Sequence, residues 1–338
     1  MANLKTSLLV AGAVVLLVAV FWWIQPNFWK KEPVKEPVKV QYQVAAGGAN
    51  ELRAQVIKKY GIDKKHGIDF EIVTTDPGEL ERRIANGESY LADISPFTIL
   101  AAKQKNINLL VISPSVLYRY HVLVSIDSHI ASVQELKGKK IGTQPKVTAA
   151  YIATAIALKA GGIDVEKDVS MVFGNIPQTA AAVEKGEADA AMVAYPPAAS
   201  LIASGKFKSA AALGDIWSQK EGGLVLPFVA LVANKDWYEH NKDTAKRAVE
   251  TILDAGRFIQ ERPSAISELT DYLNKYNLNT PPIRALLETN SPKQFPNNYG
   301  EKEVMAFERY FAQAKELKII PADAPMDSFL VKPSELGL

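Results

Sequence analysis

The sequence predicts a two-lobed α/β protein, and three observations carry this prediction. Short apolar strands alternate with helices from Val40 onward, which is typical of βαβ units. A unit made of a helix, a glycine, a glutamate and an Ala-Asp pair occurs twice, at 80–95 and at 180–194. Two further apolar strands, 120–126 and 227–233, flank the second unit, and we expect them to cross between the two lobes.

The first unit is expected to form a mostly parallel sheet, because each strand is followed by a helix. In such sheets ligands bind beyond the carboxyl ends of the strands. The expected strands are 40–46, 70–75, 90–94 and 108–113, and the expected helices begin after the turns at 47–50, 76–77 and 95–96.

The second unit repeats this order, and the tail of the chain is expected to return to the first lobe. Gly87 and Gly186 fit the left-handed position that ends a helix, and Asp93 and Asp189 are expected to fix strand starts. The expected strands are 140–143, 169–173 and 188–194, and the expected helices are 147–160, 179–185, 243–261, 264–274, 283–289 and 301–317.

Composition excludes several classes of function. The chain has 338 residues with 39 basic and 37 acidic side chains interspersed, so nothing indicates nucleic-acid binding. It has no cysteine, which excludes disulfides, thiolate catalysis and a lipid-modified cysteine. The four histidines are scattered, and no phosphate-binding, dinucleotide or nucleophile-elbow motif occurs. We therefore expect no cofactor, no metal and no enzymatic activity.

The N-terminus predicts a membrane anchor over residues 1–29. Residues 8–24 are an uninterrupted apolar run that would span about 26 Å as a helix, close to the thickness of a bilayer core. Aromatic residues follow it without a small-residue cleavage site, which favours an uncleaved anchor over a signal peptide. Lys30 and Lys31 after the span argue weakly for the opposite orientation, yet a single N-terminal span usually precedes an exported domain.

Proline spacing predicts a linker at 30–39. The repeat KEPVKEPVK blocks helix formation and favours a semi-rigid extended stalk of about 28 Å. The alternative is a structureless linker, and either one marks a domain boundary. We assign 40–121 together with 225–338 to the first lobe and 122–224 to the second.

Taken in order along the chain, these segments resemble the substrate-binding proteins of ABC importers, in the branch of nitrate, sulfonate, taurine and thiamine-pyrimidine-precursor binders. The resemblance covers about 40–317. It implies a type II periplasmic-binding fold, with a ligand cleft between two lobes joined by two crossover strands. The motifs that carry it are GIDFEIV (67–73), VQELKGKKIGT (133–143), VTAAYIATAIALKAGGI (147–163), DAAMVAYPPAA (189–199) and the two helix-glycine units.

The chain departs from this family at two loops. Where the family often has Gly-Ser-Thr, this chain has Lys146, Val147 and Thr148, and where it often has Trp-Glu-Pro, this chain has Ala194, Tyr195 and Pro196. A solute other than sulfonate or nitrate is therefore compatible with the resemblance.

The resemblance implies that the cleft is built from the loops at strand ends. The densest group is Tyr118-Arg119-Tyr120, in which arginine would clamp an acidic group and the rings would stack on a planar solute. The alternative is a surface arginine with one tyrosine in the core. The full set of expected ligand-binding residues is Gly48, Asn50, Ser95, Phe97, Tyr118, Arg119, Tyr120, Gln144, Lys146, Thr148, Asn175 and Tyr195.

Several of these residues have an ordinary structural alternative. Asn50 and Ser95 also suit helix caps, Phe97 suits the core, and Lys146 suits the solvated surface.

Three functions remain open. The first is an anchored extracytoplasmic receptor that delivers a small anionic or planar polar solute to an ABC permease and its ATPase. The second is an enzyme of thiamine-pyrimidine type, and the third is a ligand-sensing module for a membrane partner.

Overall fold

The computed structural model describes residues 36–146 and 148–338. The predicted anchor and most of the predicted linker lie outside the described residues. Among the described residues, no helix combines the length and the apolar character that crossing a membrane requires. Residues 38–338 form one compact unit.

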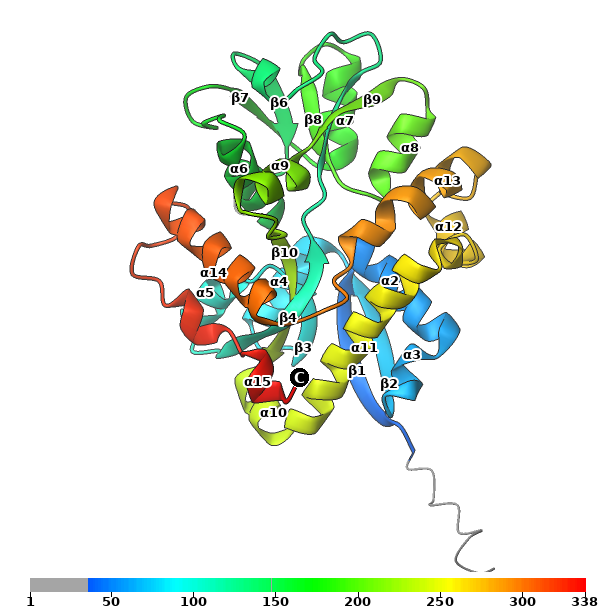
Figure 1. The fold of residues 1–338 in the computed structure, drawn as a ribbon, viewed down its shortest axis with the longest axis vertical. Coiled ribbons are helices and arrows are strands. Elements are labelled where there is room, and N and C mark those ends of the chain that lie inside the picture. The colour runs from blue at the N-terminus through cyan, green and yellow to red at the C-terminus, as the bar shows by residue number, and fades with distance from the viewer. Residues whose placement is uncertain (1–35, 147) are drawn as a thin grey trace, which may run out of the picture. The chain divides into compact units, whose positions relative to one another are not determined.

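Two five-stranded sheets, one in each lobe, organise this unit (Figure 1). The first has the strand order β2-β1-β3-β10-β4, and the second has the order β7-β6-β8-β5-β9. The strands are β1 (Val38–Ala45), β2 (Ile68–Thr75), β3 (Leu91–Ile94), β4 (Leu109–Leu117), β5 (His121–Ser125), β6 (Lys140–Thr143), β7 (Ser170–Phe173), β8 (Ala190–Val193), β9 (Phe207–Ala212) and β10 (Pro227–Asn234).

Helices cover both sheets, and the C-terminal helices lie beside the first sheet and reach toward the second (Figure 1). They are α2 (Ala49–Tyr60), α3 (Ile62–Lys65), α4 (Pro77–Ala85), α5 (Thr98–Lys103), α6 (Ala149–Ala160), α7 (Ile176–Glu184), α8 (Pro197–Ala203), α9 (Leu213–Lys220), α10 (Lys235–His240), α11 (Lys242–Glu261), α12 (Thr270–Lys275), α13 (Pro281–Asn290), α14 (Glu301–Glu316) and α15 (Pro333–Leu336), with short 3-10 turns η1 (Gln134–Leu136), η2 (Pro263–Ala265), η3 (Ser291–Gln294) and η4 (Met326–Phe329).

The two-lobed α/β architecture is confirmed, and each sheet is mostly parallel with one antiparallel strand. β10 runs antiparallel to β3 and β4, and β5 runs antiparallel to β8 and β9. The strands expected to cross between the lobes are therefore members of one sheet each. The chain passes between the sheets at 118–120 and again at 221–226.

Other differences lie at element ends and in the second lobe. β1 begins at Val38 and pairs with β2 from that residue, so the last two positions of the predicted linker belong to the sheet. β9 and the helices α8 and α9 were not predicted, and the helix expected at 264–274 is a 3-10 turn followed by α12.

A buried ion pair lies inside the first lobe. Arg53 of α2 and Asp93 of β3 are both fully buried, with 2.6 Å between Nη2 and Oδ2. Tyr42 donates its hydroxyl to Asp93, and Arg53 also donates to Tyr42, to the Ser115 hydroxyl and to the Ser115 carbonyl oxygen. Asp93 thus lies within its strand and neutralises a buried arginine, so the prediction that it fixes a strand start is wrong.

Candidate functional site

The predicted loops lie at the carboxyl ends of the parallel strands. Residues 47–50 follow β1 and 95–97 follow β3 in the first lobe, whereas 144–148 follow β6 and Asn175 and Tyr195 follow β7 and β8 in the second. This is the edge at which ligands bind in open α/β sheets.

In the first lobe, a carboxylate of the chain itself occupies the loop before α2. Glu51 is almost fully buried, and its Oε2 accepts the Gly47 N–H at 2.6 Å and the Tyr276 hydroxyl at 2.7 Å. Lys275 lies 3.1 Å from the other carboxylate oxygen. Gly48 is the N-cap of α2, and the buried Asn50 turns its side-chain oxygen toward the Glu51 N–H.

A second carboxylate binds the loop before α5. Glu81 of α4 accepts the Ser95 N–H at 3.1 Å and the Thr98 hydroxyl. Burial raises the pKa of Glu81 to about 7, against the opposing effect of these two hydrogen bonds. The Ser95 hydroxyl accepts the Phe97 N–H at 3.3 Å, so Ser95 acts as a local cap.

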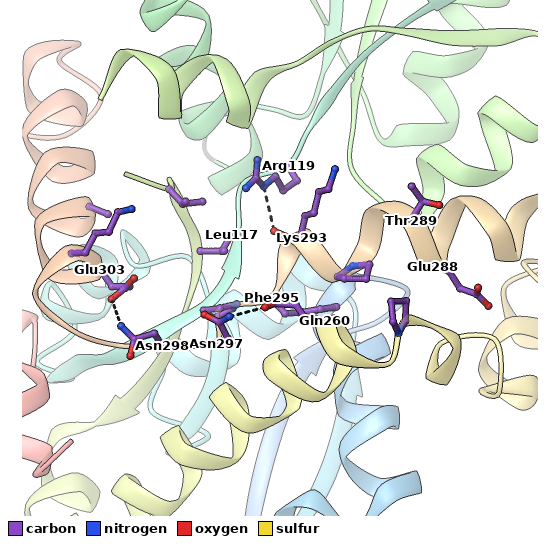
Figure 2. Close-up of a pocket in the computed structure, with 16 residues that line it drawn as sticks. Leu117, Arg119, Gln260, Glu288, Thr289, Lys293, Phe295, Asn297, Asn298 and Glu303 are labelled. Atoms are coloured by element: carbon purple, nitrogen blue, oxygen red, sulfur yellow. Dashed lines mark hydrogen bonds between the residues drawn. The ribbon is translucent and has the colours of Figure 1, made fainter. Parts of the chain in front are cut away.

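In the crossover segment 118–120, the two tyrosine side chains and the arginine side chain point to different sides of the chain. The rings of Tyr118 and Tyr120 stack at 4.9 Å with an interplanar angle of 8°, and Phe228 of β10 packs edge-on against both. Arg119 instead pairs with Asp215 of α9 and donates Nε to the Lys293 carbonyl oxygen at 3.2 Å (Figure 2). Because successive residues of an extended chain point to opposite sides, the three side chains do not act as one clamp.

Hydroxyl groups from both lobes gather beside the stacked tyrosines. Tyr118 shares a 2.7 Å hydrogen bond with Thr154 of α6, and Tyr120 is hydrogen-bonded to Gln144. Tyr310 of α14 is fully buried, and its pKa is raised by burial and by the nearby Tyr120. The Tyr310 hydroxyl has no hydrogen-bond partner among the described residues. Burial raises the pKa of all three phenols, so they stay neutral.

Phe97 completes one side of this group, because its ring packs edge-on against Tyr310 at 4.9 Å and Phe311 at 5.8 Å. We call Phe97, Tyr118, Tyr120, Thr154, Phe228 and Tyr310 the tyrosine cluster.

Apart from Gln144, the polar residues predicted in the second lobe make their contacts within that lobe. Lys146 pairs with Glu166 at 2.8 Å, and its side chain is 55% exposed. Thr148 accepts the Tyr151 N–H as the N-cap of α6, and Asn175 forms a capping box with Gln178 on α7. Tyr195 is buried and meets the ring of His121 edge-on at 5.2 Å.

The structure therefore brings four predicted residues together, namely Phe97, Tyr118, Tyr120 and Gln144. Sequence reasoning missed Thr154, Phe228 and Tyr310, which complete the cluster. Each lies in an apolar helix or strand, where the sequence pattern predicts an ordinary core residue rather than a member of a binding site.

Polar contacts on one side of the tyrosine cluster join α14 to the segment that follows the second sheet. Glu221 accepts hydrogen bonds from Arg309 at 2.8 and 3.3 Å and from Gln313 at 2.8 Å. The fully buried Trp217 of α9 donates its indole N–H to Gln313 at 2.7 Å. In the described part of the chain, no three carboxylate or histidine side chains gather as a metal site would require.

Sequence comparison identifies the family. The profile of the family described as "ABC transporter, phosphonate, periplasmic substrate-binding protein" matches residues 58–253, more than half of the chain. The chain belongs to this family. The comparison with curated proteins returned no match.

Solved structures share the fold at low sequence identity. The periplasmic aliphatic sulphonate binding protein of Escherichia coli has a TM-score of 0.68 at 15% identity, over 88% of this chain and 93% of that chain. The periplasmic nitrate-binding protein of Synechocystis PCC 6803 has a TM-score of 0.64 at 14% identity, over 87% and 85%. A desulfurization enzyme has a TM-score of 0.60 at 15% identity, over 89% and 98%. By its family, the chain is an extracytoplasmic substrate-binding protein of an ABC transporter, as its sequence predicted.

Proposed function

We propose that the protein captures an uncharged, planar polar solute at the tyrosine cluster and delivers it to an ABC permease. The observation that carries this proposal is the fully buried Tyr310 hydroxyl, which has no partner among the described residues. A buried hydroxyl without a hydrogen bond costs about 1–3 kcal/mol, which a solute with one suitable polar group would recover.

The charges around the predicted loops argue against an oxyanion. Arg119 and Lys146 are each paired with a carboxylate, and Glu51 already accepts the Gly47 N–H that an anion would bind. Glu81 occupies the next loop in the same way. An incoming anion would have to be desolvated close to these carboxyl groups, whereas a neutral solute meets only hydroxyls and aromatic faces.

The predicted N-terminal anchor and linker fit this proposal as a tether. A receptor held at the membrane surface meets its permease without diffusing through the bulk phase. We therefore propose a single N-terminal span with the binding domain on the extracytoplasmic side and no catalytic step.

A thermal-shift screen of the full chain tests the solute class. Neutral heterocycles, sulfonates, phosphonates and nitrate would be compared, because a ligand at about 100 times its Kd adds about 2.7 kcal/mol of stability. We expect a neutral planar compound to raise Tm, the shift to shrink in Tyr310→Phe, and the shift to persist in Lys146→Gln.

Two outcomes would contradict the proposal. One is a stabilising sulfonate or phosphonate whose effect requires Lys146. The other is a bound compound whose mass changes on incubation with the protein, which would favour an enzyme instead.

A further inference from the structure

A groove of about 470 Å³ lies on the Arg119 side of the crossover segments (Figure 2). Leu117 and Arg119 contribute from one crossover, and Val225 contributes from the other. The opposite walls come from η3 and from the start of α14. Since Tyr118 and Tyr120 point away from Arg119, this groove is separate from the tyrosine cluster. Its volume is in the range of small-molecule pockets.

The floor of the groove is apolar. Leu117, Val225 and Phe295 line it together with three prolines. Phe295 is itself fixed from behind, because its ring faces the buried guanidinium of Arg53 at 5.7 Å. A floor of this kind accepts an apolar ring or a short alkyl chain.

Some charged side chains of the groove have hydrogen-bond partners and others do not. Glu303 accepts the Gly300 N–H at 2.8 Å and the Asn298 side-chain amide at 3.1 Å, and Glu288 accepts the Ser267 hydroxyl. The ammonium groups of Lys293 and Lys302 have no ion-pair or hydrogen-bond partner among the described residues, and both side chains are exposed. Lys293 and Lys302 are therefore charged groups of the groove that are left without a partner in the described part of the chain, whereas both carboxylates accept hydrogen bonds from neutral donors.

Arg119 also lines the rim of the groove, but its charge is already paired and is not free to bind a ligand. Its guanidinium is held by Asp215 and by the Lys293 carbonyl oxygen, so it fixes the backbone that carries the Lys293 side chain. The side chains of Arg119 and Lys293 lie next to each other, where the crossover segment meets η3 (Figure 2).

We propose that this groove is a second ligand site that takes a small amphipathic organic anion. The apolar body would lie on Leu117 and Val225, above the fully buried Phe295, and the acidic group would meet Lys293 and Lys302. A molecule held there contacts both segments that join the lobes, so its binding opposes any movement that separates those segments. Exposed lysines suit this role because they give up little hydration when they bind an anion at a rim.

Isothermal titration of the full chain with 1-naphthalenesulfonate tests this site. The variant Lys293→Gln/Lys302→Gln removes both free cations, and Lys167→Gln/Lys185→Gln removes two exposed lysines of the second lobe as a matched control. We expect the first pair of changes to weaken binding about tenfold and the control pair to leave it unchanged. The neutral analogue 1-naphthalenesulfonamide should bind both variants alike.

The result that overturns the proposal is equal sulfonate binding by the two double variants. Sulfonate binding that is lost in Tyr310→Phe and kept in Lys293→Gln/Lys302→Gln would place the compound at the tyrosine cluster, and it would also overturn the proposal. A loss confined to the groove variant supports the second site whatever the solute of the tyrosine cluster is.

Discussion

The two copies of the helix-glycine-strand unit, at 80–95 and 180–194, have similar sequences, but some of their residues have different structural roles. In both copies the glycine adopts a left-handed conformation, with φ of 74° at Gly87 and 73° at Gly186. In both, the next residue donates its N–H back to the helix, from Glu88 to Arg83 and from Glu187 to Ala182. The turn that ends the helix is thus the same in the two lobes.

The aspartates that follow are not equivalent. Asp189 comes three residues after its glycine, and its carboxylate accepts the Lys140 N–H at 2.8 Å. The residue at that distance in the first copy is Tyr90, whose hydroxyl accepts the Gln41 N–H at 2.7 Å. Asp93 comes six residues after Gly87, where the second copy has Met192, and it neutralises the buried Arg53. The same residue type in two repeats therefore does not imply the same structural position.

The largest difference is expected between Asp93→Asn and Asp189→Asn. Asp93→Asn leaves the Arg53 charge buried and unpaired, so we expect a loss of about 3–5 kcal/mol in the free energy of unfolding. Asp189 is 39% exposed, and its change should cost less than about 1 kcal/mol. Urea denaturation measures both, and losses within 1 kcal/mol of each other would refute the distinction.

The two glycines should respond to alanine by different amounts. Both changes force an L-residue into a left-handed conformation, at about 1–2 kcal/mol. At Gly87 the new Cβ would also lie 3.0 Å from Ile107 Cδ1, whereas at Gly186 nothing lies within 4 Å. We expect Gly87→Ala to lower Tm more than Gly186→Ala, and the reverse order would show that Ile107 moves aside freely.

The pH dependence should also distinguish the copies. The folded-state pKa of Glu81 is about 7, above its usual 4.5, so the folded protein binds the extra proton between these values. Stability should therefore fall as pH rises from about 4.5 to 7, by about 1–2 kcal/mol given the partial exposure of Glu81. The corresponding residue of the second copy is Ala180.

Unfolding curves at several pH values measure this effect, with Glu81→Gln and the exposed Glu184→Gln as a matched pair. The slope should disappear in Glu81→Gln only. A slope that survives in Glu81→Gln would assign the proton to another group.

The smallest effect is expected at Tyr90 and Asp189, the two hydrogen-bond acceptors that lie three residues after the glycine in each copy. Tyr90→Phe and Asp189→Ala each remove the acceptor of one strand N–H, so each should cost about 1 kcal/mol. Hydrogen exchange of the Gln41 and Lys140 amides reports this directly, and faster exchange is expected at Gln41 in the first variant and at Lys140 in the second. Unchanged exchange at both amides would show that water replaces the acceptor without loss.

Periodicity was sufficient to predict most of the fold. Strands such as β6 and β10 and the helices α2, α11 and α14 carry clear apolar patterns, and their predicted ends lie within a few residues of the observed ones. The direction of β5 and β10 could not be predicted, because an antiparallel strand and a parallel one have the same apolar pattern. β9 (FKSAAA) was missed because its alanines favour a helix.

The candidate site was less predictable, because it depends on contacts between distant residues. Tyr118 and Tyr120 are two residues apart in the sequence, but Tyr310 comes near them from α14 only through the tertiary fold. Lys146 and Arg119 seemed available for an anion because sequence does not show that Glu166 and Asp215 face them.

The position of β10 also has a consequence for the order in which the chain acquires structure. In the first sheet β10 lies between β3 and β4, although it comes after the whole second sheet in the sequence. During synthesis the first sheet must wait for residues 227–234, whereas every strand of the second sheet has already emerged by then. We therefore expect the second lobe to be the first to become resistant to protease on a growing chain, with β4 left unpaired until β10 arrives.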